Sequence, residues 1–438
     1  MSFYLYSEME YQNWWYLSLL QVDGALDICK PLEEHIETDY VVMGGGVAWL
    51  HAAQALAEKK CKVVLIEKSI CGGGMSGRSG GFLTPDSELW LRQIEARYGT
   101  DLAQKIWSFG EHGQQSIVWN AKHHDFVCDL RQQDSLLLWL GKHGKKEVVE
   151  EFHERRSFGL SAHLVDQPHL QKHNTWLHYT SGVRYPDCYS INPMQYCQAL
   201  KLQLLKMGVR IYEFTHVHKL DRQMLHTNLW SVSFKHAIIC PGKAESELFP
   251  KQSIHTYGVQ NYIALSEPLS KAQIASMMPS GECMCRDTKL IFTYYRLTGD
   301  RRIVLWWGNA VVSFQPRHIL QQVSISQVVH DFKRMFPALR AVEFPHYRSG
   351  RIQASKDLMP LVGREKRFPN HVWVQGAVWL PWAAGCGVFA SQLLHNEADA
   401  DLTQVFSYDR PFFIPRNTNY LIPKGMIFGL CNAKAMFG

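Results

Sequence analysis

Two hydrophobic patterns alternate near the start of the chain. Residues 39–43 form a short apolar run of the kind found in buried strands, and residues 62–67 repeat it. Between these runs, Leu50, Ala53 and Ala57 recur at helical spacing, which predicts a helix with one apolar face. A strand, a helix and a second strand in this order are typical of a parallel βαβ unit.

The same two patterns recur further along the chain. Residues 87–124 are helical in pattern, and residues 191–217 read as a long helix followed by a strand. Alternating strands are predicted at 290–297 and 302–307, with the turn signal Thr-Gly-Asp between them. The chain therefore belongs to the α/β class, and one part of it has α+β character.

Length and charge narrow the class further. A chain of 438 residues is too long for one simple core, so two closely packed domains are expected. Hydrophobic residues make up 46% and charged residues 20%, an ordinary globular composition. The net charge of +6 is spread along the chain without a basic block. This argues against a nucleic-acid surface and suits anionic small molecules.

Cysteine and histidine usage indicates a reducing compartment and no metal site. The 11 cysteines are irregularly spaced, unlike a disulfide framework, and the 21 histidines show no metal-binding spacing. The apolar run at residues 13–22 is far shorter than the roughly 20 residues that span a bilayer, and no basic segment precedes it. It is expected to pack on the body of a cytoplasmic protein without a membrane span.

The turn after the first strand has the residues of a dinucleotide site. Gly44, Gly45 and Gly46 lead into the predicted helix, where Gly44 permits a tight turn and Gly46 lets backbone amides approach a pyrophosphate. Glu67 ends the second strand, 21 residues after Gly46, and Lys68 follows it. An acid there would accept hydrogen bonds from adenosine ribose hydroxyls and disfavours NADP. The alternative is an ordinary βαβ unit with a glycine-rich turn.

Trp49 stands where such a turn normally has its third glycine. That glycine allows close packing between helix and strand. An indole there is expected to push the helix outward or to find a local cavity, and overpacking of this kind costs about 1–3 kcal/mol.

A second glycine-rich segment favours a flavin cofactor over a nicotinamide cofactor. Six glycines fall in the ten positions from Gly72 to Gly81, and such a bare backbone can wrap a ligand and donate several amides. Arg78 would supply positive charge to a pyrophosphate or to a neighbouring acid. The alternative reading is a flexible surface loop, and an NAD-linked dehydrogenase leaves this segment unexplained.

With these pieces in order, the chain resembles the D-amino-acid oxidase superfamily of flavoproteins, of the glycine oxidase, sarcosine oxidase and gamma-glutamylputrescine oxidase type. The motif SGRSGG carries the resemblance first. HAIICPG, YIALSEPLS and SGRIQASKDLMPLVG follow in the family's order, and VWVQGAVWLPWAAGCG and RPFFIPR complete it over about residues 36–416.

The resemblance implies FAD as a non-covalent cofactor. Some relatives attach flavin through a cysteine, which RIQASKD lacks, and others through a histidine, which SGRSGG lacks. Cys386 near the closing loop is a minor alternative. The residues expected to bind the cofactor are Gly44, Gly45, Gly46, Glu67, Lys68, Ser76, Gly77, Arg78, Ser79, Gly80, Gly81, Val217, Gly242, Gly376, Trp379 and Leu380. Trp49, Trp306, Trp307 and Trp379 depart from the family's usual glycines.

The family's chain crosses repeatedly between two domains. Applied here, residues 1–35 form an N-terminal extension, while residues 36–90, 186–250 and 346–438 form a Rossmann-like FAD-binding domain. Residues 91–185 and 251–345 form the substrate domain, which is built on a mixed sheet and interleaved with the first.

The resemblance further implies oxidation of a small amine or amino acid by hydride transfer, with oxygen or another acceptor reoxidising the flavin. Arg351 or Arg348 would clamp a substrate carboxylate, and an ion pair between domains is the alternative. Lys356 would stabilise reduced flavin, unless it simply faces solvent. Tyr295, with Tyr294 and Arg296, would floor the pocket or be ordinary sheet residues. A scaffold that kept the fold but lost turnover is the competing hypothesis.

Overall fold

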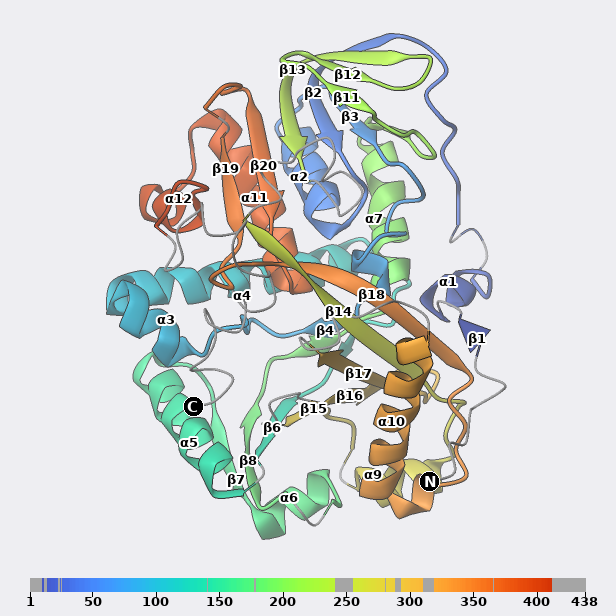
Figure 1. The fold of residues 1–438 in the computed structure, drawn as a ribbon, viewed down its shortest axis with the longest axis vertical. Coiled ribbons are helices and arrows are strands. Elements are labelled where there is room, and N and C mark those ends of the chain that lie inside the picture. Colours follow the sequence, from blue (N-terminus) through green and yellow to red (C-terminus); the bar gives the residue numbers. More distant parts are fainter. Residues whose placement is uncertain are drawn as a thin grey trace.

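In the computed structural model, two large sheets carry the fold (Figure 1). The structure describes residues 10–11, 14–22, 24, 26–139, 141–176, 179–240, 255–279, 281–287, 293–309, 319–364 and 366–411. The α/β class with a mixed second sheet is confirmed.

The eight-stranded sheet contains the predicted βαβ unit. Its strands run in the order β10-β3-β2-β13-β12-β11, and β20 pairs with β13 and with β19. Their bounds are β2 Ile36–Met43, β3 Val63–Ile66, β10 Arg210–Tyr212, β11 Lys219–Leu220, β12 Met224–His226, β13 Ser231–Ile239, β19 Leu361–Arg364 and β20 His371–Gln375. β2 is parallel to both β3 and β13. Parallel strands buried on both faces explain why residues 39–43 and 62–67 read as continuous apolar runs.

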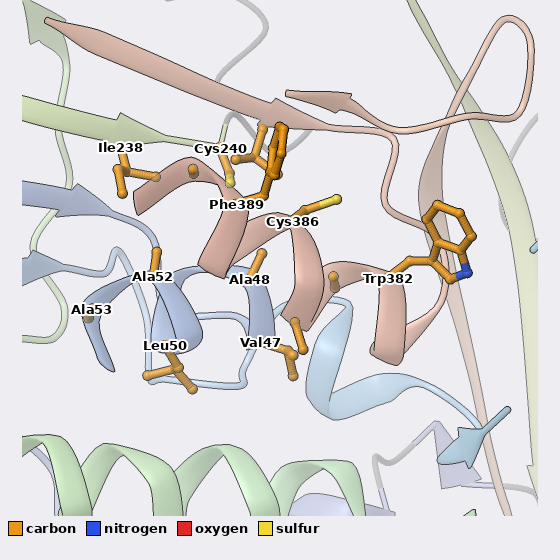
Figure 2. Close-up of a cluster of buried hydrophobic side chains, with 14 of the residues drawn as sticks. Val47, Ala48, Leu50, Ala52, Ala53, Ile238, Cys240, Trp382, Cys386 and Phe389 are labelled. Atoms are coloured by element: carbon orange, nitrogen blue, oxygen red, sulfur yellow. The ribbon is translucent and has the colours of Figure 1, made fainter. Parts of the chain in front are cut away.

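Helices α2 Val47–Glu58, α11 Leu380–His395 and α12 Ala400–Phe406 pack on strands of this sheet. α7 Pro193–Lys206 packs on α2, α4 Thr100–His123 packs on α11, and α3 Leu91–Tyr98 packs on α4. α2 and α11 approach closely, because a Cβ added at Gly387 would lie 1.9 Å from the Ala48 carbonyl oxygen. Figure 2 shows the small side chains of Ala48 and Ala52 beside α11, with Phe389 packed near them.

The nine-stranded sheet is mixed and runs in the order β1-β18-β14-β17-β16-β15-β6-β8-β7. The strands are β1 Glu10–Tyr11, β6 Ser135–Trp139, β7 His163–Asp166, β8 Ser181–Tyr185, β14 Thr256–Leu265, β15 Met284–Asp287, β16 Thr293–Leu297, β17 Ile303–Asn309 and β18 His346–Ser355. The accompanying helices are α5 Gly141–Ser157, α6 Gln167–His173, α9 Lys271–Met277 and α10 Ile319–Met335. Phe332 of α10 and Phe336, which follows the helix, belong to the core on one face of this sheet.

Short elements join the two halves. They are α1 Trp14–Leu19, β4 Phe82–Leu83, β5 Arg131–Gln132, β9 Tyr189–Ser190 and the 3₁₀ turns Ser76–Arg78 and Pro337–Leu339. The apolar run at residues 13–22 packs on the body as expected, since Trp15 and Leu19 of α1 are buried. The Trp15 indole donates to the carbonyl oxygen of Ser79, 2.9 Å away, so α1 also anchors the second glycine-rich segment.

The division into domains stays a prediction, although the sheets follow much of it. The segment starting at residue 346 opens with β18, which pairs with β14 in the nine-stranded sheet. Within the described ranges, no helix combines the length and apolar character needed to cross a membrane. The ten described cysteines are free thiols.

Candidate FAD and substrate site

A cavity of about 980 Å³ is lined by residues from both sheets. The eight-stranded sheet contributes the glycine turn and the ends of β2 and β3, whereas the nine-stranded sheet contributes a wall from β14, β16, β17 and β18. This volume lies at the upper end of the range for small-molecule and cofactor sites.

The glycine turn forms the floor at one end. Gly44 has φ +124°, a conformation that side chains rarely adopt, and its N–H donates to the Ile66 carbonyl oxygen at 2.7 Å. Gly46 is the N-cap of α2, so the positive end of the helix dipole faces the cavity. The Val47 N–H donates to Ser76 Oγ at 3.0 Å, which ties the two glycine-rich segments together.

Trp49 folds back over this turn. Its indole N–H donates to the Met43 carbonyl oxygen, and its ring lies 2.6 Å from the position of a Cβ added at Gly46. The side chain is half-buried and lines the cavity. The expected local cavity is therefore the ligand cavity itself, and the indole occupies space beside the helix N-terminus.

Glu67 lies at the end of β3, where the ribose-binding acid was expected. The carboxylate accepts a hydrogen bond from the Ser69 N–H at 2.8 Å. Burial raises the pKa of the Glu67 carboxyl, while the backbone amides of Ser69 and Gly45 act in the opposite direction. Thr215 and Val217 line the cavity together with Glu67, so the adenosine end has both a polar acceptor and an apolar edge.

Arg296 is hydrogen-bonded to the second glycine-rich segment, residues 72–81. Its Nε donates to the Gly80 carbonyl oxygen and its Nη2 to that of Ile191, each at 2.8 Å. The side chain is fully buried, and burial lowers its pKa to about 10. Sequence reasoning placed Arg296 in the pocket floor but missed this contact, because Gly80 lies 216 residues away.

The far wall is a row of paired residues across the nine-stranded sheet. Arg348 of β18 pairs with Ile263 of β14, which pairs with Trp306 of β17, and Trp306 pairs with Tyr294 of β16. Paired residues share a face of the sheet, and all four line the cavity. The Trp379 ring lies 5.6 Å from that of Tyr294, so the loop before α11 joins the same aromatic surface.

Most of the predicted cofactor residues line this one cavity. They are Gly44, Gly46, Glu67, Lys68, Ser76, Arg78, Ser79, Gly80, Gly81, Val217, Gly376, Trp379 and Leu380. Gly45 and Gly77 belong to the same turns but are not among the lining residues. Gly242 lies outside the described residues.

The three predicted catalytic residues are placed differently. The Tyr295 hydroxyl accepts a hydrogen bond from Asn174, and its ring packs 5.3 Å from Phe332 in the core. Lys356 is buried just beyond β18 and does not line the cavity. Arg351 pairs with Gln260 in the strand ladder, and its side chain is not described. Their catalytic roles stay predictions, while Arg348 and Tyr294 line the cavity.

Two further polar residues of the cavity were missed from the sequence. Asn261 of β14 is 6% exposed, and its Oδ1 has no hydrogen-bond partner among the described residues. Glu88 lies in the segment between β4 and α3 and lines the cavity beside Trp379. Neither stands in a motif, and only the pairing of β14 with its neighbours would have placed Asn261 here.

A glycine turn at a helix start, an acid one strand away and an aromatic wall define a dinucleotide-binding flavoprotein site. Residues 39–393 match the sequence profile of the DAO family, described as FAD dependent oxidoreductase. The chain belongs to this family, as the resemblance predicted, and the predicted oxidoreductase class is confirmed.

Curated relatives cover the same region. The chain is 27% identical over 344 residues to the gamma-glutamylputrescine oxidoreductase of Escherichia coli, covering 76% of this chain and 78% of that protein. It is 26% identical over 344 residues to a probable oxidoreductase OrdL of Haemophilus influenzae, covering 76% and 77%.

Solved structures share the fold. Glycine oxidase from Geobacillus kaustophilus has a TM-score of 0.70 at 14% identity, covering 86% of this chain and 100% of that one. L-amino acid deaminase from Proteus vulgaris has a TM-score of 0.72 at 16% identity, covering 89% and 99%.

The residues present fit the family's FAD. Gly46 and the start of α2 form a binding site suited to a diphosphate, and Glu67 and Val217 form a binding site suited to adenosine. At the other end of the cavity, the Oδ1 of Asn261 has no hydrogen-bond partner in the part of the chain that the structure describes, and it is a buried acceptor that a bound molecule would satisfy.

Proposed function

We propose that the chain binds FAD non-covalently and oxidises a small amine or amino acid. The observation that carries the proposal is one cavity that runs from the glycine turn to the aromatic wall. The printed functions of several similar proteins support it, because a gamma-glutamylputrescine oxidoreductase, a glycine oxidase and an amino acid deaminase all handle amines or amino acids.

The protein's own residues would hold and orient the reactants. Glu67 would accept hydrogen bonds from the ribose, and Gly46 with α2 would face the diphosphate. Bound FAD would supply the electron sink, taking a hydride from the carbon next to the substrate nitrogen. The substrate would thereby become an imine, which water hydrolyses, and oxygen or another acceptor would take up the electrons.

Arg348 and the aromatic wall would orient the substrate. Arg348 lines the cavity at one end of the wall, and its guanidinium would bind the carboxylate where the substrate is an amino acid. Ile263, Trp306 and Tyr294 would exclude water from the substrate and fix its direction toward the cofactor. The substrate nitrogen must be neutral at the moment of reaction, so activity should rise with pH until the free amine dominates.

The buried position of Cys386 supports non-covalent attachment. Cys386 is fully buried in α11, and burial raises the pKa of its thiol, so it is a poor nucleophile toward a flavin. FAD should therefore appear in the supernatant after acid precipitation of the holoprotein. A yellow pellet would contradict this part of the proposal.

The absorption spectrum tests the proposed reaction. Purified protein supplied with FAD should show a flavin spectrum that bleaches anaerobically when an amine or amino acid is added. The proposed reaction would be contradicted if the folded protein binds FAD but no compound in a broad set of amines and amino acids bleaches the bound flavin.

A further inference from the structure

Glu88 is an acid at the substrate end of the cavity. The side chain lines the cavity, and burial raises the pKa of its carboxyl, against the opposing effects of Arg286 and the Trp379 side chain. Its backbone position is fixed, because Ser87 Oγ accepts from the Leu89 N–H at 3.0 Å and donates to the Leu89 carbonyl oxygen at 2.8 Å. These bonds order the backbone on both sides of Glu88.

The neighbouring acid shows what Glu88 lacks. Asp86 forms an ion pair with the buried Arg155, which also pairs with Glu151 at 3.0 Å. Glu88 forms no ion pair within the described ranges, and the Trp379 indole nitrogen approaches it without closing a regular hydrogen bond. The nearby Arg286 donates instead to the Tyr294 hydroxyl at 3.0 Å. A half-buried acid that lines a cavity without a close ion pair favours a positively charged ligand.

Aromatic rings surround the same space. The rings of Trp306 and Tyr294 lie 5.5 Å apart and those of Trp379 and Tyr294 5.6 Å apart, and all three residues line the cavity. Aromatic faces attract ammonium groups, and a carboxylate beside them adds a charge-assisted hydrogen bond. Asn261 Oδ1, the buried acceptor on the neighbouring strand, offers a further site for an N–H donor.

We infer that the substrate is an amine with a second, positively charged amino group, and that Glu88 binds this distal ammonium among Trp306, Trp379 and Tyr294. This inference rests on the proposed function and names the substrate class. One amino group is oxidised as the neutral amine, while the other stays protonated and fixes the distance from the reacting carbon to the wall.

Calorimetric titration of the FAD-loaded protein under anaerobic conditions tests the inference. The probes are 1,4-diaminobutane, butylamine and 4-aminobutyrate, which have the same carbon chain but end in an ammonium, a methyl group or a carboxylate. The diamine should bind about 10- to 100-fold more tightly than butylamine. Equal affinities, or the tightest binding by 4-aminobutyrate, would overturn the inference.

Variants locate the effect. Glu88→Gln should bring the diamine to the affinity of butylamine and leave butylamine unchanged, whereas Glu88→Asp should keep part of the preference. Glu58→Gln, an exposed change at the end of α2, should behave like the unchanged protein. A diamine preference that survives in a folded, FAD-loaded Glu88→Gln protein would show that another group binds the cation.

The two proposals can fail separately. If diamines bind through Glu88 but no amine bleaches the flavin, the proposed oxidation fails and the ligand class stands. If butylamine bleaches the flavin as well as the diamine does, in both the unchanged protein and Glu88→Gln, the oxidation stands and the ligand class fails.

Discussion

The two ends of the cavity are built in different ways. At the cofactor end, Gly44, Gly46, Glu67 and Ser76 come from one continuous stretch, folded by a local βαβ unit. At the substrate end, Arg348, Ile263, Trp306 and Tyr294 come from four strands and meet only through the register of the sheet. Cofactor binding can therefore be read from local sequence, whereas substrate choice depends on long-range pairing.

The largest expected effect is at the buried ion pair behind the substrate wall. Asp86→Asn should lower the free energy of unfolding by about 3–5 kcal/mol, because Arg155 would lose a buried partner. Burial raises the pKa of Asp86, but Arg155 and Arg286 more than offset it, so the net pKa is lowered. The pair's contribution is present above the ordinary aspartate pKa and is lost as pH falls through the lowered one.

Denaturant unfolding of the Asp86→Asn variant measures this loss. Glu397→Gln, which breaks the exposed pair with Lys59, is the matched control and should change stability by at most about 1 kcal/mol. Equal losses from the two changes would show that the buried pair contributes no more to stability than the exposed one.

A second prediction concerns His51, behind the glycine turn. This fully buried ring has its Nε2 2.8 Å from the Tyr196 hydroxyl, and burial lowers its pKa to about 3. In the unfolded chain His51 takes up a proton near pH 6.5, whereas in the folded protein it stays neutral to a much lower pH. The free energy of unfolding therefore falls as the pH drops below about 6.5. Between pH 7 and pH 4, His51 should account for about 3 kcal/mol of the loss.

His51→Gln tests this at the cofactor end. Its unfolding free energy should fall less steeply with acid than that of the unchanged protein, measured by denaturant titration at several pH values. His35→Gln, at an exposed position, is the control and should keep the original slope. An unchanged slope in the His51 variant would mean that the ring is protonated in the folded protein.

The smallest expected effect is at Trp49, where the local motif departs from its usual form. A diphosphate that approaches α2 must displace the indole from its bond to the Met43 carbonyl oxygen, at a cost of about 1 kcal/mol. Trp49→Ala should therefore bind FAD about 5-fold more tightly. Fluorescence titration with FAD measures this, with the exposed Trp119→Ala as control. Weaker binding by Trp49→Ala would show that the indole supports the cofactor.

The local structure of the cofactor half could be predicted from the sequence because its contacts are short-range. The glycine turn, α2 and Glu67 follow from spacing and periodicity alone. Trp49 was expected to disturb the packing of the helix, but the direction of its side chain depends on space that only the folded turn defines. Tyr294 and Tyr295 illustrate the limit at the other end, because neighbouring strand residues face opposite sides and the sequence does not say which side meets the cavity.

The roles of Glu88 and Arg296 were beyond sequence reasoning for the same reason. Glu88 belongs to no sequence motif, and its proposed role depends on Trp306 and Tyr294, which lie more than 200 residues away in the sequence. Arg296 reads as a strand residue until its guanidinium is seen to bond Gly80. Long-range pairing, rather than composition, decides both.

The most direct test of the account is a titration of the folded, cofactor-free protein with FAD, followed by absorption and by equilibrium dialysis. We predict one FAD per chain, released by acid and displaced by excess adenosine diphosphate ribose, which shares only the adenosine end. A folded protein that stays colourless and retains no FAD at saturating concentration would contradict it.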